Sequence, residues 1–349
     1  MKNKDVYSPY KFAHHIGKLE DIKEGKIVAP VNLQLDPTNR CNSKCAFCFY
    51  DIHDLDNFSR RDQLGLEKII GLLDDFKSLG GKSVEFTGGG EPLVHKDFDA
   101  MSAYAKGRGL ERALVTNGIL LDKHMDVVKD YSWVRISLNS ASPGGYADVH
   151  NVNSKNFGRV VNNLEELCKV KTDDNVVGVS VVVYEKNWED IFRIGKIAKS
   201  SGANNYRISL AHTDEGAKIF SGIWDGVIDQ IEKTKELGDD EFRVFSFSNR
   251  INDIAKQTRG GFCFYHHLTT AVGANGDVYP CCYFKYDDKF KLGNVNEESF
   301  VDIWKGEIRQ EFIDGVGKDC YASCWMTEKN KFAQYLTTDK ADVPHLNFP

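Results

Sequence analysis

Strand and helix patterns alternate along the first two-thirds of the chain, and this alternation restricts the fold more than any other feature. Short apolar and β-branched runs predict strands at six places: Val31–Leu35, Ser83–Phe86, Arg112–Val115, Trp133–Leu138, Val176–Val183 and Asn205–Leu210. Helical spacing of apolar residues predicts helices between them, for example over Phe157–Val170 and Glu189–Ser200. Consecutive βα units predict parallel strands with the helices outside.

The fold class that we expect is α/β, a partial (β/α)6 barrel followed by a small C-terminal cysteine-rich domain. A barrel fits the polar residues that end the strands, because α/β proteins bind ligands there; a doubly wound sheet is the alternative. The expected boundaries are an N-terminal extension at 1–30, the barrel at 31–212, a linker region at 213–259, the cysteine-rich domain at 260–326 and a C-terminal tail at 327–349.

Charge and hydropathy exclude several classes of protein. The 349 residues carry 45 lysines and arginines against 51 acids, a net charge of −6, which argues against broad binding to a nucleic-acid backbone but leaves a local basic patch open. The apolar run Val176–Val183 is far too short to span a membrane. The polar N-terminus lacks the apolar core of a secretory signal, so we expect a cytoplasmic protein without a membrane partner.

Nine cysteines need an explanation, and all but Cys168 fall into two clusters. An odd number in clusters favours metal ligation over a disulfide framework. Cys168 lies on a helical pattern, which predicts a buried apolar role.

The first cluster is Cys41, Cys45 and Cys48, a C-x₃-C-x₂-C motif just after the first predicted strand. Three thiolates on one short loop can hold three irons of a cubane cluster and leave the fourth iron open. A structural zinc ion is the alternative, but it needs a fourth protein ligand, for which His53 is the nearest candidate.

This motif in this place, with Phe47 before the last cysteine, resembles the radical S-adenosylmethionine (SAM) superfamily. The resemblance implies a [4Fe–4S] cluster on Cys41, Cys45 and Cys48, with SAM bound to the open iron and Phe47 beside the cofactor. It implies reductive cleavage of SAM to a 5′-deoxyadenosyl radical that abstracts hydrogen from a substrate. It also implies an electron donor such as flavodoxin or ferredoxin.

A glycine-rich segment after the second predicted strand supports this resemblance. Gly88, Gly89, Gly90 and Glu91 are similar to the segment whose backbone meets the methionyl amino group of SAM in that family. Glycine allows such a close approach of the backbone.

Polar residues on two later strands complete the predicted cofactor site. Alternation puts Ser137 and Asn139 on the lumen face of the fourth strand, where they could bond the ribose or carboxylate of SAM. Arg207 takes the same face of the sixth strand and could clamp a carboxylate. The alternative is that these polar groups satisfy one another inside the barrel.

The second cluster reads C-x₁₂-G-x₄-C, from Cys263 through Gly276 to Cys281, and is followed by Cys320 and Cys324. It resembles the auxiliary-cluster domains of the SPASM and twitch subgroups, and twitch, with one auxiliary [4Fe–4S] cluster, is the better match. The resemblance implies Cys263, Cys281, Cys320 and Cys324 as ligands, and full ligation favours electron transfer or a structural role. Cys282 is the alternative to Cys281, and structural zinc is the alternative to the cluster.

The reaction is less defined than the radical generator. We expect an enzyme, of isomerase or oxidoreductase class, that isomerises, dehydrogenates or epimerises a small molecule or nucleoside. A peptide maturase and a non-catalytic iron–sulfur protein are the alternatives. About thirty residues precede the first strand, too few for a winged-helix domain that binds a leader peptide, which favours the first reading.

A finer resemblance concerns the substrate. Tyr10–His15, Ala29–Thr38 and Pro344–Phe348 are similar to segments of radical enzymes of phage DNA base hypermodification. One such type isomerises 5-Nα-glycinylthymidine, which would make modified DNA the substrate.

The remaining candidates are weaker. Asp36 and Asn39 are turn-forming residues expected to shape the cysteine loop. Residues that could reach a substrate as acid–base groups or hydrogen donors are His14, His15, Tyr184, His212, His266 and His267.

Overall fold

A curved sheet organises the molecule. The computed structural model describes residues 7–211, 216–246, 262–315, 324 and 326–342. In this part of the chain the strands follow the order β10-β9-β8-β1-β2-β3-β4-β5-β6-β7. Their bounds are β1 (Asn32–Leu35), β2 (Ser83–Phe86), β3 (Glu111–Thr116), β4 (Trp133–Ser137), β5 (Val176–Val183), β6 (Asn205–Leu210), β7 (Arg243–Ser246), β8 (Thr269–Val272), β9 (Asp277–Tyr279) and β10 (Gly293–Asn294).

The predicted partial barrel is confirmed. Strands β1 to β7 pair in chain order and in parallel, whereas a doubly wound sheet reverses direction at a switch point. The sheet is not closed, because its edges are β7 and β10. The six predicted strands lie within two residues of β1 to β6, and β2, β5 and β6 have the predicted bounds.

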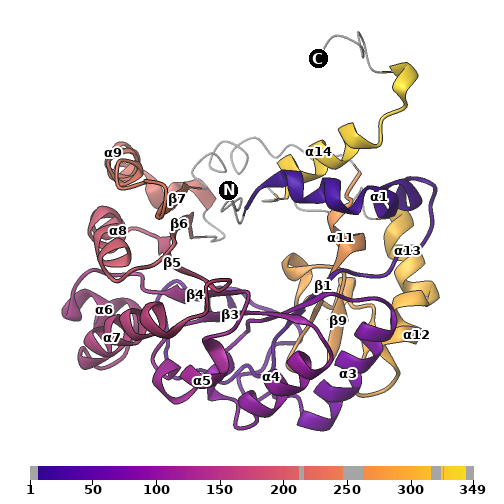
Figure 1. Cartoon of the computed structure of the whole chain (residues 1–349), viewed down its shortest axis with the longest axis horizontal. Coiled ribbons are helices and arrows are strands. Elements are labelled where there is room, and N and C mark those ends of the chain that lie inside the picture. The colour runs from indigo at the N-terminus through magenta and orange to yellow at the C-terminus, as the bar shows by residue number, and fades with distance from the viewer. Residues whose placement is uncertain (1–6, 212–215, 247–261, 316–323, 325, 343–349) are drawn as a thin grey trace.

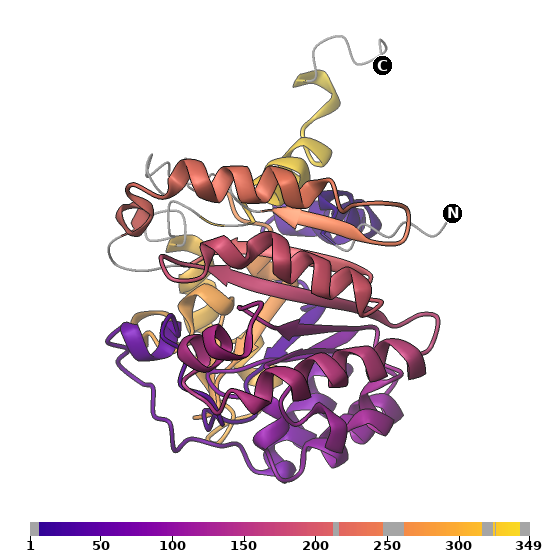
Figure 2. The same ribbon diagram turned by 90° about the vertical axis from the view of Figure 1, so that its left-hand side faces the viewer.

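Helices cover the outer face of this sheet, as Figure 2 shows for the magenta to orange helices. They are α3 (Leu66–Ser78), α4 (Phe98–Gly107), α5 (Met125–Val128), α6 (Pro143–His150), α7 (Lys155–Val170), α8 (Ile191–Ser200) and α9 (Trp224–Lys235). Helix α3 shows why they form: Ile69, Leu73 and Phe76 recur at helical spacing and are fully buried. Burial of each such side chain contributes about 1.5–3 kcal/mol.

The strands alternate between this outer core and the lumen. On β4 and the residue after it, Val134, Ile136 and Leu138 are buried in the main apolar core. Arg135 lies between them in sequence and lines the lumen instead. The predicted division of the two faces is therefore confirmed on β4.

The second half of the chain extends the sheet at both edges. Strand β7, which lies in the expected linker at 213–259, pairs in parallel with β6. Strand β8, from the cysteine-rich region, pairs in parallel with β1 and is followed by antiparallel β9 and β10. The cysteine-rich region thus shares the sheet of the barrel, and its helices are α11 (Tyr265–Leu268), α12 (Phe300–Lys305) and α13 (Glu307–Gly315).

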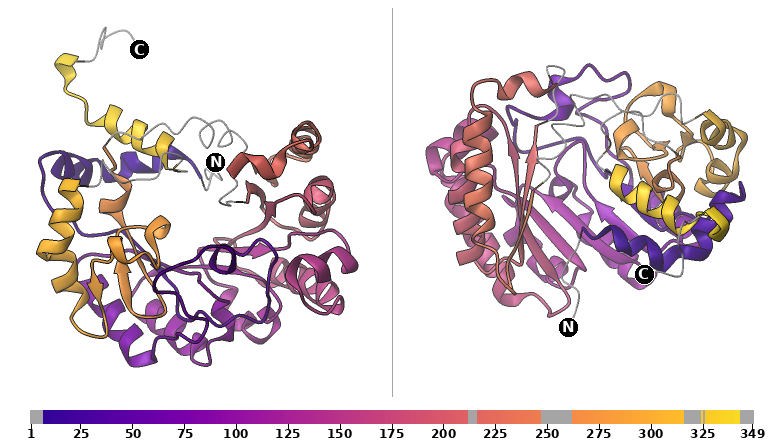
Figure 3. Two further views of the ribbon diagram at one scale, coloured as in Figure 1. Left: turned by 180° about the vertical axis from the view of Figure 1, so that it is seen from behind. Right: turned by 90° about the horizontal axis from the view of Figure 1, so that it is seen from above.

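The N-terminal segment lies across the open side of the curved sheet. It forms η1 (Pro9–His15) and α1 (Ile16–Lys23), which lie beside α14 (Thr327–Leu336). Phe12 and Leu19 share an apolar cluster with Phe264 and Ala333. Figure 1 shows α1 and α14 above α11, across the opening from β7, and the left panel of Figure 3 shows the same arrangement from behind. The segment therefore contributes to the wall of the lumen.

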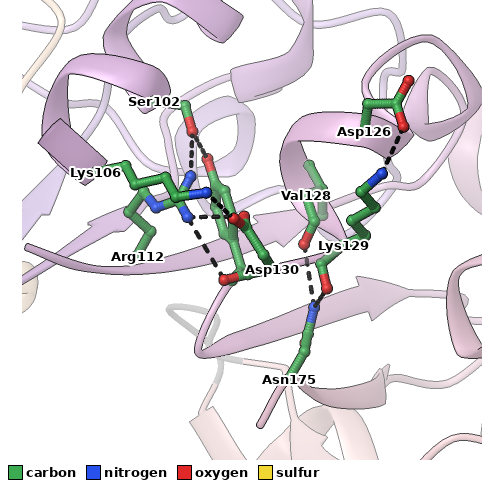
Figure 4. Close-up of polar contacts among 9 residues, drawn as sticks. Ser102, Lys106, Arg112, Asp126, Val128, Lys129, Asp130 and Asn175 are labelled. Atoms are coloured by element: carbon green, nitrogen blue, oxygen red, sulfur yellow. Dashed lines mark hydrogen bonds and ion pairs between the residues drawn. The ribbon is translucent and has the colours of Figure 1, made fainter. Parts of the chain in front are cut away.

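Polar contacts fix the amino ends of the central strands (Figure 4). Arg112 of β3 donates to Ser102 at 3.2 Å and pairs with Asp130 at 2.7 Å. Asn175 donates to the carbonyls of Val128 and Lys129 at 3.1 Å. The guanidinium of Arg112 is thereby held on the helix side of the sheet.

The other short elements are helix α2 (Phe49–Ile52) and the 3₁₀ turns η2 (Pro92–Val94), η3 (Leu121–Lys123), η4 (Trp188–Asp190), η5 (Gly216–Phe220), η6 (Cys282–Phe284), η7 (Asp288–Phe290) and η8 (Lys340–Asp342). Among the described residues, no helix is both long and apolar enough to cross a bilayer.

Candidate functional site

The first cysteine motif occupies the loop between β1 and α2. Burial raises the pKa of Cys41 to about 11, and burial together with the neighbouring thiols raises the pKa of Cys45 to about 12. The electrostatic influence of Cys41 and Cys48 on Cys45 means that the three thiols lie close together. Protonated thiols do not bind metal, so ligation here must release protons.

This set of ligands fits an iron–sulfur cluster. Three thiols on one short loop are the donor set of a cubane cluster, in which each thiolate binds a different iron. His53, the candidate fourth zinc ligand, packs against Phe49 with ring centroids 4.2 Å apart and the ring planes tilted by 43°.

His150 at the end of α6 supports this loop, and sequence reasoning missed it. Its Nδ1 lies 3.3 Å from the Cys45 sulfur, and its carbonyl accepts from the Lys44 amide at 3.0 Å. Its ring stacks on Tyr146 with centroids 4.2 Å apart. Burial lowers the pKa of His150 to about 4, so the ring is neutral at pH 7.

Arg60 is a second supporting residue that the sequence did not reveal. Its guanidinium donates to the Cys48 sulfur at 3.2 Å and to the Asn39 carbonyl at 3.2 Å. It also donates to the Gly89 carbonyl and pairs with Asp51 at 2.8 Å. Arg60 therefore links the cysteine loop to the glycine-rich segment.

The glycine-rich segment packs directly on the start of the cysteine loop. A Cβ on Gly90 would lie 2.1 Å from the Arg40 carbonyl oxygen, and one on Gly89 would lie 2.2 Å from Asn39 Oδ1. Gly88 is also tight, since its Cβ would lie 2.9 Å from the Gly90 carbonyl oxygen. Contact within the protein thus explains why these positions need glycine. The predicted contact of this segment with SAM stays a prediction.

Glu91 is buried at the ends of β2 and β3. Its carboxylate accepts from the Thr116 hydroxyl at 2.6 Å, the Asn117 amide at 2.7 Å and the Leu93 amide at 3.2 Å. Burial raises the pKa of Glu91 despite these donors. The side chain joins two strand ends, and its predicted contact with the cofactor is untested.

A buried ion pair connects the cysteine-rich region to the first cysteine loop. Lys285 donates to both carboxylate oxygens of Asp36 at 2.8 Å, and Asp36 accepts from the Gly89 amide at 3.1 Å. The hydroxyl of Tyr286 lies 3.0 Å from Asp36 and 2.7 Å from Asn39 Oδ1. These bonds agree with the loop-shaping role expected for Asp36 and Asn39.

The predicted cofactor residues on the later strands have different surroundings. Ser137 pairs in register with Ser180, which pairs with Arg207, so Ser137 and Arg207 lie at one level of the sheet. Asn139 has φ 54° and its side-chain oxygen accepts from the Val182 amide at 2.8 Å. The Asn139 oxygen thus bonds to a backbone amide, and its predicted contact with SAM stays a prediction.

Phe47 and Tyr184 lie together beside the cysteine loop. Their ring centroids are 5.4 Å apart, and both belong to an apolar cluster with Val149. A substrate role for Tyr184 and a cofactor contact for Phe47 remain predictions.

Three of the four predicted ligands of the second cluster fall in the described chain, and Cys320 lies outside it. Burial raises the pKa of Cys281 well above its usual value, and Cys263 and Cys324 also influence it. These three thiols are therefore near one another, as a shared cluster requires. Cys281 is buried among aromatic side chains, whereas Cys282 lines the lumen cavity. The surroundings favour Cys281 as the ligand.

The lumen holds a cavity of about 1090 Å³. Its wall includes Tyr50, two residues after Cys48, and Cys282, next to Cys281. Tyr7 and His15 of the N-terminal segment also line it, together with Arg207 of β6. Segments that carry the two cysteine motifs therefore border the same space.

The other candidates lie elsewhere. His266 and His267 are buried, and none of their ring nitrogens has a hydrogen-bond partner among the described residues. His14 is exposed, and His212 lies outside the described residues. Cys168 is partly buried against the main apolar core, close to the predicted apolar role.

Comparisons with known proteins agree with this arrangement. The family model described as the radical SAM superfamily matches residues 35–198, and the SPASM model, an iron–sulfur cluster-binding domain, matches residues 263–326. The tungsten-containing aldehyde ferredoxin oxidoreductase cofactor-modifying protein of Pyrococcus furiosus is 26% identical over 89% of this chain and 90% of its own. The mycofactocin maturase MftC of Mycolicibacterium smegmatis is 26% identical over 88% of this chain and 79% of its own.

A solved structure shows the same fold. The chain matches SuiB of Streptococcus suis bound to S-adenosylmethionine with a TM-score of 0.66 and 16% identity, over 90% of this chain and 75% of that one. The two matched domains imply a [4Fe–4S] cluster, SAM and an auxiliary cluster as cofactors. The chain belongs to the radical SAM superfamily of enzymes and carries a SPASM domain.

Proposed function

We propose that this enzyme removes a hydrogen atom from a small-molecule or nucleoside substrate held in the barrel lumen. The observation that carries the proposal is the cavity of about 1090 Å³ that segments of both cysteine motifs border. Pockets of about 300–1,000 Å³ enclose drug-sized ligands, so this space suits a substrate of that class.

Each part of the site has a task in this proposal. When bound, the cluster and SAM supply a 5′-deoxyadenosyl radical that abstracts hydrogen. Cys41, Cys45 and Cys48 would hold that cluster, while Gly88 to Gly90, Ser137 and Phe47 would contact SAM. Arg60 and His150 hold the loop through the sulfurs of Cys48 and Cys45.

The cysteine-rich region would hold the auxiliary cluster with Cys263, Cys281, Cys320 and Cys324. Four protein ligands would leave no iron open to substrate, so its role in this proposal is to carry an electron or to stabilise the fold. The wall formed by Tyr7 and His15 would exclude water from the lumen.

A peptide maturase is the second candidate, because of the relatives. MftC is named a maturase, and a further SuiB structure, with a TM-score of 0.63, holds a precursor peptide. A peptide would have to enter the same lumen to reach the radical.

Anaerobic reconstitution followed by SAM and dithionite tests the proposal. We expect 5′-deoxyadenosine by liquid chromatography and mass spectrometry, with none from Cys45→Ala and normal amounts from Cys168→Ala. Deuterated candidate substrates, nucleosides in one arm and peptides in the other, would transfer deuterium to 5′-deoxyadenosine. Iron-loaded wild-type protein that binds SAM yet forms no 5′-deoxyadenosine would contradict the proposal.

A further inference from the structure

The lumen cavity is positively charged in an acidic protein. Eight lysines and arginines line it against two glutamates, whereas the whole chain carries a net charge of −6. Arg112 and Lys285 are paired with acids, Asp130 and Asp36 (Figure 4 shows the first pair). An excess of positive charge remains without these two, and it raises the local concentration of anions.

Arg135 and Arg207 contribute two of these positive charges. Arg135 projects from β4 and Arg207 from β6, and strand β5 separates them. Both meet Tyr7: Arg135 lies 3.5 Å from its hydroxyl, and the Arg207 guanidinium carbon lies 5.5 Å from its ring centroid. Two guanidiniums from different strands thus approach one side chain.

The two guanidinium groups repel each other. Burial and then the charge of Arg135 lower the pKa of Arg207 to about 10, so the Arg207 guanidinium remains charged at neutral pH. Glu85 offsets part of this repulsion, but its carboxylate also accepts from Gln34 at 3.0 Å. Holding like charges together in a part-buried lumen is unfavourable, and an anion bound between them would relieve this repulsion.

We propose that Arg135 and Arg207 bind an oxyanion of the substrate, a carboxylate or a phosphate, inside the lumen. This inference rests on the proposed function and names the class of its substrate. Planar guanidinium groups suit both anions because they form paired hydrogen bonds. The substrate anion takes the place of the SAM carboxylate that the sequence predicted for Arg207. Arg135 lies two residues before the carboxyl end of β4, whereas the cysteine loop follows the carboxyl end of β1.

Chemical labelling tests the site without turnover. Phenylglyoxal modifies arginine, and peptide mapping reads each position in the anaerobic, cluster-loaded, SAM-bound enzyme. Malonate should slow modification of Arg135 and Arg207 by about tenfold, and the neutral isostere malonamide should not. Arg159, which pairs with Asp122 on the surface, is the internal control and should be unaffected. Inorganic phosphate forms a parallel arm, and protection by phosphate alone would assign a phosphate group.

Calorimetry with the same probes measures the affinity of wild type and of arginine variants for each anion. The affinity for the protecting anion should fall by about tenfold in Arg135→Gln and in Arg207→Gln. It should fall by less in Arg135→Lys and Arg207→Lys, and it should not change in Arg159→Gln. Equal affinity in wild type and both glutamine variants would overturn the proposal. The proposal would also be overturned if SAM alone fully protected both arginines and neither malonate nor phosphate then bound to the SAM-bound enzyme. Neither experiment requires 5′-deoxyadenosine, so the proposed function can stand if this inference fails.

Discussion

A buried ion pair joins the two cysteine-bearing regions of the protein. The Lys285 and Asp36 side chains are 6% and 0% exposed, and Asp36 also accepts from the Gly89 amide. A charge buried this deeply is tolerated only with its partner in place. The position of the glycine-rich segment therefore depends on a lysine almost 250 residues away in sequence.

Removing one partner of this pair should destabilise the protein strongly. Lys285→Met leaves Asp36 charged and unpaired, and we expect a loss of about 3–5 kcal/mol of unfolding free energy. Urea denaturation measures it, and Lys289→Met, on the exposed side of the same segment, is the matched control. The double variant Asp36→Asn with Lys285→Met should recover part of the loss. Equal midpoints for Lys285→Met and Lys289→Met would refute this expectation.

His267 should make stability depend on pH. Burial, and then Arg309, lower its pKa from 6.5 to about 3 in the folded state. Because only the unfolded chain protonates below about pH 6.5, stability is full above that pH and falls as the pH drops toward 3. Between about pH 7 and 5.5, wild type should lose about 1.2 kcal/mol more than His267→Phe in urea titrations. Parallel pH profiles for the two proteins would show that His267 is not the titrating group.

At the scale of elements, the site is formed where loops meet at the carboxyl ends of strands. The cysteine loop after β1, the glycine-rich segment after β2 and Asn117 after β3 bond to one another. Asn117 donates to Asn42 at 2.6 Å, and the Glu91 amide donates to the Arg40 carbonyl at 2.9 Å. Parallel pairing brings these strand ends to one edge of the sheet.

Gly90 should be more sensitive to substitution than a glycine with open space around it. Gly90→Ala would place a methyl group 2.1 Å from the Arg40 carbonyl, which must push the cysteine loop away. We expect reduced iron loading after reconstitution and a lower unfolding midpoint. Gly71→Ala is the control, since nothing lies within 4 Å of its Cβ, and alanine in helix α3 should stabilise by about 0.5–1 kcal/mol. Normal iron content in Gly90→Ala would contradict the packing argument.

At the scale of the whole molecule, two distant cysteine motifs border one cavity because the sheet is curved and shared. Strand β8 pairs with β1, so the cysteine-rich region joins the barrel beside its first strand. The N-terminal segment and α14 then cover the open side (Figure 1). A substrate bound in the lumen, as proposed, would be adjacent to residues that follow both motifs.

Iron content tests whether both motifs hold cubane clusters. Anaerobically reconstituted protein should contain about eight irons per chain, and about four if the second site binds zinc. Cys281→Ser should lower the count by up to about four, whereas Cys282→Ser should not, because only the Cys281 side chain lies among the buried aromatic residues. Iron and zinc analysis with electron paramagnetic resonance provides the measurement. Loss of iron from Cys282→Ser alone would reverse the assignment of the ligand.

Local patterns were sufficient to predict strands β1 to β6 and helices α7 and α8. Strands β2, β5 and β6 were predictable to the residue, because β-branched and alternating runs bounded by turn residues are local signals. Arg60 and His150 were not predictable, since each reaches a cysteine sulfur from another element and neither belongs to a spacing pattern. Strand β7 lies within the expected linker at 213–259 and pairs with β6, and the boundaries of that linker stay a prediction.

The sequence by itself determined the chemistry of the ligands and the order of the elements, since thiol spacing and hydrophobic periodicity are properties of neighbouring residues. Only the tertiary structure decided which groups meet: Lys285 with Asp36, Tyr7 with Arg135 and Arg207, and β8 with β1. The physical reason is that burial and charge depend on distance in space. Chain closure brings together residues whose separation in sequence carries no signal.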